Sequence, residues 1–232
     1  MLRKWSELPE DMRNDSVREY YEILNKKKSA LRVKRMADVF LVLIFIILLS
    51  PVMFLIACWI KLDSKGPVFY RQERITQYGR KYRIFKFRTM ITGADKKGPL
   101  VTEKGDSRIT RVGKKLRKLR LDEIPQLFNI LTGDMTFVGT RPEVQKYVDC
   151  YTDEMKATLL LPAGITSSTS IVYKDEDDMI ESYLQKGMTD VDEIYMNKIL
   201  PEKMKYNLEY IRAFGFISDL KIMLRTALAV VK

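Results

Sequence analysis

The sequence contains no histidine among its 232 residues. This absence excludes a Ser-His-Asp or Cys-His catalytic arrangement, a histidine metal site and a histidine-based pH switch. Any acid, base or nucleophile must therefore be an Asp, Glu, Lys, Tyr or Cys side chain. Cysteine is also scarce, because only Cys58 in an apolar stretch and Cys150 in a polar one are present. Two such cysteines make no disulfide framework, so we expect a reducing compartment.

Acidic residues are fewer than basic ones, with 30 Asp and Glu against 41 Lys and Arg and a net charge of +11. The length suits one compact domain with appendages. Excess positive charge is typical of proteins that bind anionic membranes, phosphates or nucleic acid. The sequence has no internal repeat, no P-loop pattern and no paired-glycine dinucleotide motif, so those nucleotide-binding classes are excluded.

One long apolar run stands out against this charged background. Residues 39–60 carry no charge, and only Ser50 and Pro51 interrupt their apolar character. A straight helix over this run would reach about 33 Å, which is enough to cross a bilayer. A buried core helix is the alternative, but a helix so long and apolar all round is unusual in a small domain. We therefore expect this segment to insert into a membrane.

The break at Ser50-Pro51 predicts a re-entrant path over residues 34–62 rather than a simple crossing. Proline removes a backbone donor and clashes with the preceding turn, and each half of the run is too short to cross alone. Basic residues flank both ends of the run, and such residues mark the cytoplasmic side. We expect a kinked helix that enters and leaves by the same face, with a single kinked span as the alternative.

Three residues at the edge of this run are candidate interfacial anchors. Asp38 follows Lys34 by four residues and Arg35 by three, so it could pair with either on one helical face. Such a pair would be a routine interfacial ion pair or would help to shape the re-entrant helix. Residues 1–33, which come before this run, predict an amphipathic helical segment at the surface or interface.

After Gly66-Pro67 the chain changes character. Residues 68–72 and 82–90 are rich in aromatic and β-branched residues and are separated by a turn at Gly79, which predicts a β-hairpin. Residues 108–120 predict a basic amphipathic helix, which suggests an interfacial helix on anionic lipid. A solvated charged face and nucleic-acid binding are the alternatives, and the neighbouring apolar run favours lipid or phosphate.

The basic helix leads into an acidic pair, Asp122 and Glu123. Ile124 precedes a proline and is biased out of the helical region, whereas Pro125 suits the first turn of a new helix that Gly133 would end. The pair therefore lies near the amino end of the second helix, where a carboxylate is held ionised. An ionised carboxylate among phosphate-binding groups suits a nucleophile or a metal ligand, although a solvated helix end is the plainer interpretation.

Four later segments complete the sequence. Arg141-Pro142 lies in a turn-rich loop and offers a planar fork suited to phosphate oxygens. Residues 143–158 predict a helix, the acidic stretch 174–185 indicates solvated surface, and residues 218–231 predict a helix that begins with a Ser-Asp cap. This last helix would belong either to the core or to the membrane surface.

Taken in order, these pieces resemble the bacterial sugar transferases, or monotopic phosphoglycosyl transferases, of the minimal single-domain type. The likeness covers roughly residues 34–145 and is specific as an ordered series. Its pieces are Lys34-Arg35-x-x-Asp38, Ser50-Pro51, Gly66-Pro67-Val68, Gln72-x-Arg74, Lys86-Phe87-Arg88-Thr89-Met90, Arg108 to Gly113, Leu121-Asp122-Glu123-x-Pro125-Gln126 and Gly133-Asp134-Met135-x-x-Val138-Gly139-x-Arg141-Pro142.

The resemblance implies a fold and an activity. The fold would be α/β, mostly helical with a small β-hairpin or sheet, one re-entrant membrane helix and interfacial amphipathic helices. Residues 63–232 would form the catalytic domain on the cytoplasmic face of the bacterial inner membrane. The enzyme would move a sugar-1-phosphate from a UDP-sugar to undecaprenyl phosphate, release UMP and begin glycan assembly. Homo-oligomer formation is left open, and a membrane-anchored basic module that binds nucleic acid or anionic lipid without catalysis is the alternative.

The resemblance also implies residue roles. Asp122 would be the nucleophile that forms a phosphosugar-enzyme intermediate, with Glu123 beside it. Mg²⁺ would assist the reaction, and Asp122 is the candidate ligand of this ion. Arg117 and Arg141 match phosphate-binding arginines, and Arg88 is a further candidate contact. The chain departs from the family pattern at four places, listed here: Thr140 for proline, Arg120 for a small hydroxyl residue, Ile124 for Leu, and Ser167-Ser168 for Gly-Trp. The last departure leaves the identity of the sugar open.

Overall fold

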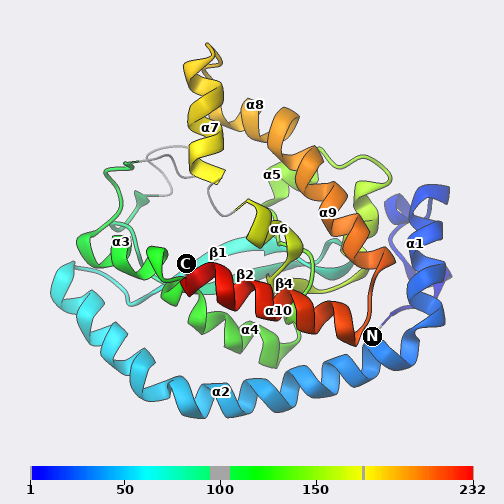
Figure 1. Cartoon of the computed structure of the whole chain (residues 1–232), viewed down its shortest axis with the longest axis horizontal. Helices are drawn as coiled ribbons and strands as arrows, with labels where there is room; N and C mark the ends of the chain where they lie inside the picture. Colours follow the sequence, from blue (N-terminus) through cyan, green and yellow to red (C-terminus); the bar gives the residue numbers. More distant parts are fainter. Residues whose placement is uncertain (1, 95–104, 174–175, 232) are drawn as a thin grey trace.

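The structure is a computed structural model that describes residues 2–94, 105–173 and 176–231. It is mostly helical and contains two small sheets (Figure 1). This confirms the helical class with a small hairpin that the sequence predicts. The α-helices are α1 (Asp15–Lys26), α2 (Lys28–Asp63), α3 (Arg111–Lys118), α4 (Leu127–Thr132), α5 (Gln145–Val148), α6 (Ser168–Val172), α7 (Glu176–Gln185), α8 (Val191–Ile194), α9 (Leu200–Arg212) and α10 (Phe216–Val231). The strands are β1 (Phe69–Ile75), β2 (Lys81–Phe87), β3 (Met135–Val138) and β4 (Ala163–Thr166).

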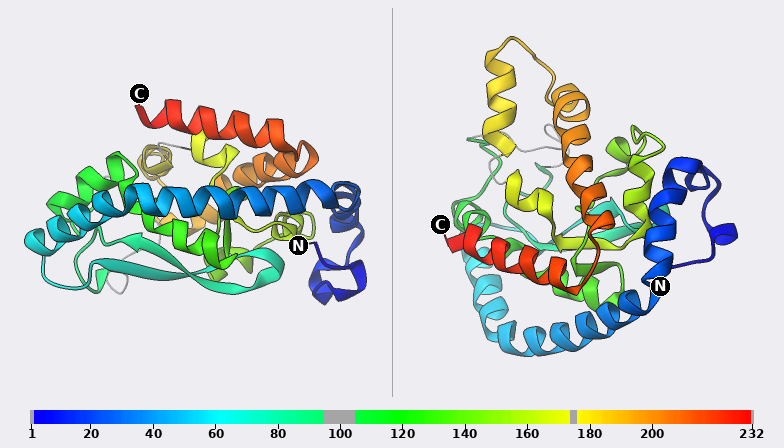
Figure 2. Two further views of the ribbon diagram at one scale, coloured as in Figure 1. Left: turned by 90° about the horizontal axis from the view of Figure 1, so that it is seen from below. Right: turned by 45° about the vertical axis from the view of Figure 1, so that its right-hand side comes forward.

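The predicted hairpin is present as β1 and β2. The two strands pair antiparallel, with Phe69 opposite Phe87 and Ile75 opposite Lys81. Alternate residues of β2 face the interior, so Tyr82 and Ile84 are buried. The hairpin lies on one side of the molecule and α10 on the other, with α2 between them in the left view of Figure 2.

A second, parallel sheet joins distant parts of the chain. β3 and β4 pair with Thr136 opposite Gly164 and Val138 opposite Thr166. Directly after β3, Gly139 lies so close to Gly164 of β4 that a Cβ atom on either would collide with the backbone of the other. The carboxyl ends of both strands therefore emerge side by side and lead directly into Arg141 and Ser167.

The apolar run lies inside α2, one helix of 36 residues with Pro51 inside it. Only 11% of its most apolar 18-residue window is buried. A core helix of a soluble protein would be mostly buried, so this exposure argues against the core alternative. The residues that do face the protein form one stripe at spacings of three and four, listed here: Asp38, Val42, Ile46, Leu49, Met53, Ile56 and Ile60.

The two halves of α2 contact different parts of one body. Before Ser50, Val42 packs with Tyr82 and Ile130, whereas after Pro51, Ile60 packs with residues of α3. Figure 1 shows α2 as one long arc along the molecule. Ser50 Oγ donates to Ile47 O at 2.9 Å, and such back-bonding next to a proline bends helices. The structure thus has one curved helix, and membrane re-entry stays a prediction.

The N-terminal segment packs into the main core. Val17, Tyr20 and Leu24 of α1 are almost completely buried and belong to the same cluster as residues of α9. The amphipathic pattern is therefore confirmed, and its apolar face is covered by protein. The predicted boundary at residue 34 falls inside α2, which begins at Lys28.

Two helix predictions need correction. The helix expected over 143–158 is wrong, because the chain forms the short α5 and a separate 3₁₀ helix, Met155–Leu160. The helix predicted at 218–231 is confirmed as α10, but it begins at Phe216. Asp219 therefore lies within the helix, where it is buried and pairs with Lys34 at 2.6 Å.

Candidate active site

The acidic pair lies on a short 3₁₀ helix, η5 (Leu121–Gln126), between α3 and α4. Its position is set by the neighbouring Asn129, whose side chain bridges α4 to the free edge of β2. Asn129 Oδ1 accepts from Phe85 N at 2.8 Å, and Asn129 Nδ2 donates to Arg83 O at 3.0 Å. Gly133 ends α4 in the left-handed region at φ 86°, as the sequence predicts. The strand and η5 are thereby held in contact.

Glu123 is held by cations. Lys86 Nζ on β2 lies 2.8 Å from Glu123 Oε1, and Arg120 NH1 lies 3.8 Å from Oε2. Burial by itself raises the pKa of Glu123, but the charges of Lys86 and Arg141 outweigh burial and lower that pKa to about 2. Glu123 is therefore ionised throughout the neutral range.

Asp122 has a different environment although it is adjacent to Glu123 in the chain. Its side chain is buried, and no described residue forms a salt bridge with it. Burial raises the pKa of Asp122 above its usual value. The charge of Lys86 lowers this pKa, and the charge of Glu123 raises it further. A desolvated carboxylate without an ion-pair partner keeps its oxygens available for attack or for a metal ion.

Two of the predicted arginines act on this pair. Arg117, in the last turn of α3, lowers the pKa of Asp122 by its charge. Arg141 lowers the pKa of Glu123 in the same way. The structure therefore brings both arginines into the electrostatic environment of the acidic pair, which we call the Asp122–Glu123 dyad.

Arg88 is engaged elsewhere. Its guanidinium donates to Ser64 O at 2.7 Å, Ser64 Oγ at 2.8 Å and Lys65 O at 2.9 Å, so it binds the C-terminal end of α2. A Cβ atom on Gly66 would collide with this guanidinium. Arg88 is buried, and a role in phosphate binding stays a prediction.

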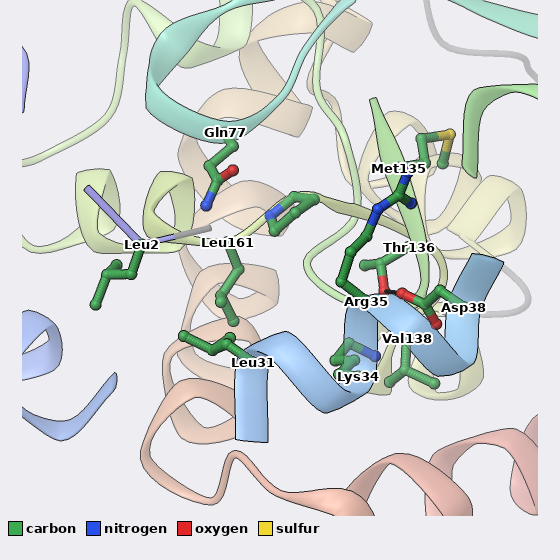
Figure 3. Close-up of a pocket in the computed structure, with 11 residues that line it drawn as sticks. Leu2, Leu31, Lys34, Arg35, Asp38, Gln77, Met135, Thr136, Val138 and Leu161 are labelled. Carbon is green, nitrogen blue, oxygen red and sulfur yellow. Dashed lines mark hydrogen bonds between the residues drawn. The ribbon is translucent and has the colours of Figure 1, made fainter. Parts of the chain in front are cut away.

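The three predicted anchors of α2 hold it to the catalytic domain (Figure 3). Lys34 pairs with Asp219, Arg35 donates to Ile130 O at 2.6 Å, and Thr136 donates to Asp38 Oδ2 at 2.5 Å. The expected pairing of Asp38 with Lys34 or Arg35 is therefore wrong. All three side chains point to the protein body, where acceptors and donors from α10, α4 and β3 satisfy them.

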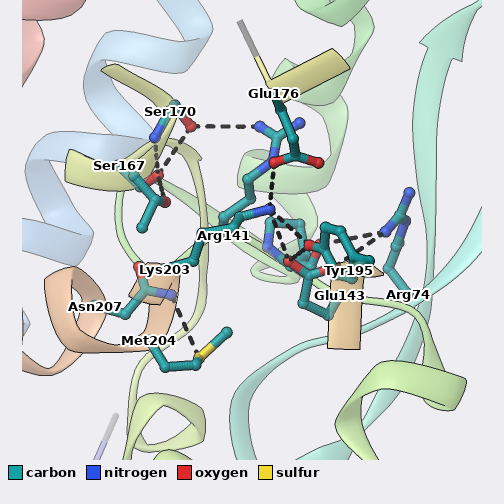
Figure 4. Close-up of polar contacts among 12 residues, drawn as sticks. Arg74, Arg141, Glu143, Ser167, Ser170, Glu176, Tyr195, Lys203, Met204 and Asn207 are labelled. Atoms are coloured by element: carbon teal, nitrogen blue, oxygen red, sulfur yellow. Dashed lines mark hydrogen bonds and ion pairs between the residues drawn. The ribbon is translucent and has the colours of Figure 1, made fainter. Parts of the chain in front are cut away.

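Arg141 lies against α6 and a buried ionic network (Figure 4). Arg141 NH1 donates to Ser170 Oγ at 3.3 Å. Behind it, Lys203 of α9 is 2% exposed and lies 2.8 Å from Glu176 and 3.5 Å from Glu143. Tyr195 donates to Glu143 at 2.7 Å. Burial lowers the pKa of Arg141, but Glu123, Glu176 and Glu143 outweigh it and raise that pKa above its usual value.

Sequence reasoning missed several of these residues. Lys86 shares the inward face of β2 with Tyr82 and Ile84, and a lysine in register with two core positions is the signal that could have found it. Glu176 belongs to the stretch interpreted as solvated surface, yet it pairs with a buried lysine from α9. Only the fold brings these two together.

The donor set is compatible with Mg²⁺ in one particular way. Among the described residues there is no group of three or more Asp, Glu, His or Cys side chains that could hold a metal. Mg²⁺ is commonly held by one or two carboxylates together with substrate phosphates. Glu123 is occupied by cations, so Asp122 is the carboxylate of the dyad that fits this role.

Comparison with known proteins assigns a family to the chain. The family profile described as bacterial sugar transferase matches residues 29–232. A UDP-N-acetylgalactosamine-undecaprenyl-phosphate N-acetylgalactosaminephosphotransferase of Aeromonas hydrophila is 34% identical over 84% of this chain and 42% of its own length. A UDP-glucose:undecaprenyl-phosphate glucose-1-phosphate transferase of Klebsiella pneumoniae is 33% identical over 83% of this chain and 39% of its own.

The relatives differ in length. The chain spans about two fifths of the two proteins above, whereas it covers 67% of a UDP-glucose:undecaprenyl-phosphate glucose-1-phosphate transferase of Caulobacter vibrioides, which is 33% identical over 83% of this chain. The profile match contains all of α2 except Lys28, together with the dyad and the network around Arg141. The chain belongs to the bacterial sugar transferase family.

Proposed function

We propose that this protein transfers a sugar-1-phosphate from a UDP-sugar to undecaprenyl phosphate and releases UMP. The observation that carries the proposal is the asymmetry of the dyad. Asp122 is buried without an ion-pair partner among the described residues, while Glu123 beside it is ionised and held by Lys86. This asymmetry separates a reactive carboxylate from a supporting one. The names of the relatives support the substrate classes.

The first step is attack by Asp122 on the β-phosphorus of the UDP-sugar. A bond forms between a carboxylate oxygen and phosphorus, while the bond from phosphorus to the bridging oxygen breaks. UMP leaves with that oxygen, and a phosphosugar remains on Asp122. Arg117 and Arg141 offset the negative charge of the transferring group, which is the main contribution a protein makes to phosphoryl transfer.

The second step returns the enzyme to its starting state. A phosphate oxygen of undecaprenyl phosphate bonds to the same phosphorus, and the bond to Asp122 breaks. The products are the free Asp122 carboxylate and undecaprenyl diphosphate-sugar. Glu123 stays ionised and orients the η5 segment through Lys86. When bound, Mg²⁺ would supply charge neutralisation of the diphosphate, with Asp122 as the protein ligand that fits it.

The exposed face of α2 supports a membrane placement. The outward residues of this helix are large and apolar, such as Phe40, Leu48 and Phe54, while its inward stripe holds it to the catalytic domain. We propose that α2 enters and leaves the inner membrane by the cytoplasmic face, because both of its halves contact one body and both flanks are basic. The basic α3 and the amphipathic α10 would then lie at the interface.

A membrane-anchored basic module without catalysis is the weaker candidate. It gives no reason for a buried, unpaired Asp122 next to a cation-held Glu123. The sugar stays open, since the relatives named above include enzymes for N-acetylgalactosamine and for glucose.

The test is an assay of UMP release by the full chain in nanodiscs with undecaprenyl phosphate and a panel of UDP-hexoses and UDP-N-acetylhexosamines. We expect one of these donors to support turnover and Asp122→Asn to abolish it. Without acceptor, we expect one equivalent of UMP and a mass increase of one phosphosugar on Asp122. The matched control is Asp153→Asn, an exposed carboxylate that pairs only with Lys156 among the described residues. Full activity of Asp122→Asn would refute the covalent mechanism.

A further inference from the structure

Arg120 has an unusual backbone for its residue type. Its φ of 52° and ψ of 23° lie in the left-handed region, and Tyr78 is the other non-glycine residue with positive φ in the described part of the chain. An arginine there is strained, and such residues gather at functional sites. Arg120 lies two residues before Asp122, where the turn from α3 into η5 requires this conformation.

The side chain of Arg120 lies between the dyad and α6. Arg120 NH1 is 3.8 Å from Glu123 Oε2, and Arg120 NH2 donates to Ser170 O at 3.4 Å. Arg141 NH1 donates to the hydroxyl of the same Ser170 at 3.3 Å. One serine therefore contacts two guanidinium groups, one through its carbonyl and one through its side chain.

Ser170 is itself fixed by a buried group of hydroxyls. Ser167 Oγ accepts from Ser170 N at 3.0 Å and lies 2.9 Å from Ser170 Oγ. Thr169 Oγ1 lies 2.6 Å from Ser167 Oγ, and all three residues are buried. This rigidity matters because a ligand that binds two arginines gains affinity when their spacing is set beforehand.

Both guanidiniums keep donors for a ligand. A guanidinium has five N–H groups. Among the described residues, Ser170 alone accepts a hydrogen bond from either guanidinium group. The contact distances of 3.3 to 3.8 Å are long for charged groups. Both side chains therefore have capacity for shorter bonds to an anion.

The charges behind Arg141 are already balanced. Glu143 and Glu176 lie next to Lys203, and Arg74 NH1 lies 3.9 Å from Glu143. At the dyad, Lys86 holds Glu123 at 2.8 Å. Each of these carboxylates thus has a cation nearer to it than Arg120 or Arg141, so an anion can bind the two arginines without leaving a carboxylate unpaired.

We propose that Arg120 and Arg141, joined by Ser170, form a two-arginine cradle that binds the diphosphate of the nucleotide sugar. This rests on the proposed function and extends it to two residues without an assigned role. Arg120 supplies a second planar fork for phosphate oxygens. Ser170 is a positioning residue that sets the distance between the forks.

The cradle is tested by the affinity of the full chain in nanodiscs for UDP, which contains the diphosphate but no sugar. Arg120→Asn removes the charge and keeps a residue that tolerates the left-handed region, while Arg120→Lys keeps the charge and loses the fork. Ser170→Ala removes the hydroxyl bridge. The matched controls are Arg83→Ala, an exposed arginine on β2, and Ser182→Ala on α7.

We expect UDP to bind Arg120→Asn about 10-fold or more weakly and Ser170→Ala about 3-fold to 10-fold weakly. Arg120→Lys should recover part of the affinity. In turnover, the loss should fall mainly on KM for the UDP-sugar, with melting temperatures within a few degrees of the wild type. Both controls should bind UDP as the wild type does.

Two outcomes would overturn the cradle. Wild-type UDP affinity in Arg120→Asn would show that Arg120 does not bind the diphosphate. A large fall in melting temperature with unchanged UDP affinity in the folded fraction would show that the contacts only tether α6 to η5. Failure of the wild type to bind UDP or release UMP would instead refute the proposed function, so the two failures are distinguishable.

Discussion

Lys86 and Glu123 are 37 residues apart in the chain and form a salt bridge of 2.8 Å between β2 and η5. This contact joins the hairpin to the dyad and gives Glu123 a hydrogen-bonded cation. Burial is the main cause that raises the pKa of Asp122, to which the anionic Glu123 adds, while the charge of Lys86 lowers it.

Substitution of Lys86→Met should lower kcat for UMP release by about 10-fold to 100-fold, because a buried carboxylate loses its nearest cation. Steady-state kinetics of UMP release at about neutral pH would measure this fall in kcat. Lys81→Met is the matched control, since Lys81 lies on the same strand and forms a half-exposed pair with Glu73 at 2.9 Å. Wild-type kcat in Lys86→Met would contradict a supporting role for Lys86.

The rate of the first step should fall as pH decreases, because only the ionised Asp122 attacks phosphorus. Burial raises the pKa of Asp122, so this acid limb should lie at higher pH than for an ordinary aspartate. Glu123, with a pKa lowered to about 2, stays ionised over the same range. Single-turnover UMP release as a function of pH measures the limb.

Two variants should move this acid limb in opposite directions. Lys86→Met removes a charge that lowers the pKa of Asp122, so the limb should shift to higher pH. Glu123→Gln removes a charge that raises that pKa, so the limb should shift to lower pH even if the rate is reduced. If the rate fell at the same pH in both variants, Asp122 would not control this titration.

Arg88→Met should affect stability more than substrate binding. The variant leaves the carbonyl of Ser64 without its guanidinium donor, while Lys65 O keeps the 3.3 Å bond from Thr92 Oγ1, and this loss should cost about 1–3 kcal/mol of unfolding free energy. Thermal unfolding in detergent and KM for the UDP-sugar would be measured together, with Arg83→Ala as the exposed control. A 10-fold rise in KM at an unchanged melting temperature would support the phosphate contact suggested by the sequence resemblance.

The inward stripe of α2 should matter for folding in a way that its outward face does not. Ile60 is 2% exposed and Leu55 is 67% exposed on the same helix. Ile60→Ala should cost about 2–5 kcal/mol, whereas Leu55→Ala should leave thermal unfolding in detergent almost unchanged. Equal destabilisation by both variants would mean that Leu55 also packs against protein.

Cysteine labelling tests the path of α2 through the membrane. After replacement of the native Cys58 and Cys150 by Ala, single cysteines would be placed at Ser29 and Lys65, which are exposed beyond the two ends of the apolar run. A membrane-impermeant maleimide should label both positions in inverted vesicles, whose outer surface is the cytoplasmic side, and neither position in sealed right-side-out vesicles. Labelling from opposite sides would establish a single kinked span.

The local elements could be predicted from the sequence because short-range rules determine them. The apolar run, the hairpin around Gly79, the end of α4 at Gly133 and the placement of Asp122 and Glu123 at a helix junction all follow from periodicity and from glycine and proline positions. Roles for Arg117 and Arg141 came from an ordered motif series, and both lie in the electrostatic environment of the dyad.

The contacts that give these residues their chemistry depend on the tertiary structure. Lys86 reaches Glu123 across 37 residues, Asp219 reaches Lys34 across 185, and Ser170 reaches Arg120 across 50. Neither helical nor strand periodicity predicts such partners, because these contacts result from the packing of separate elements. The sequence by itself thus determined which groups could react and which run is long and apolar enough to enter a membrane. The fold decided which carboxylate is paired, since burial and charge depend on distance in space.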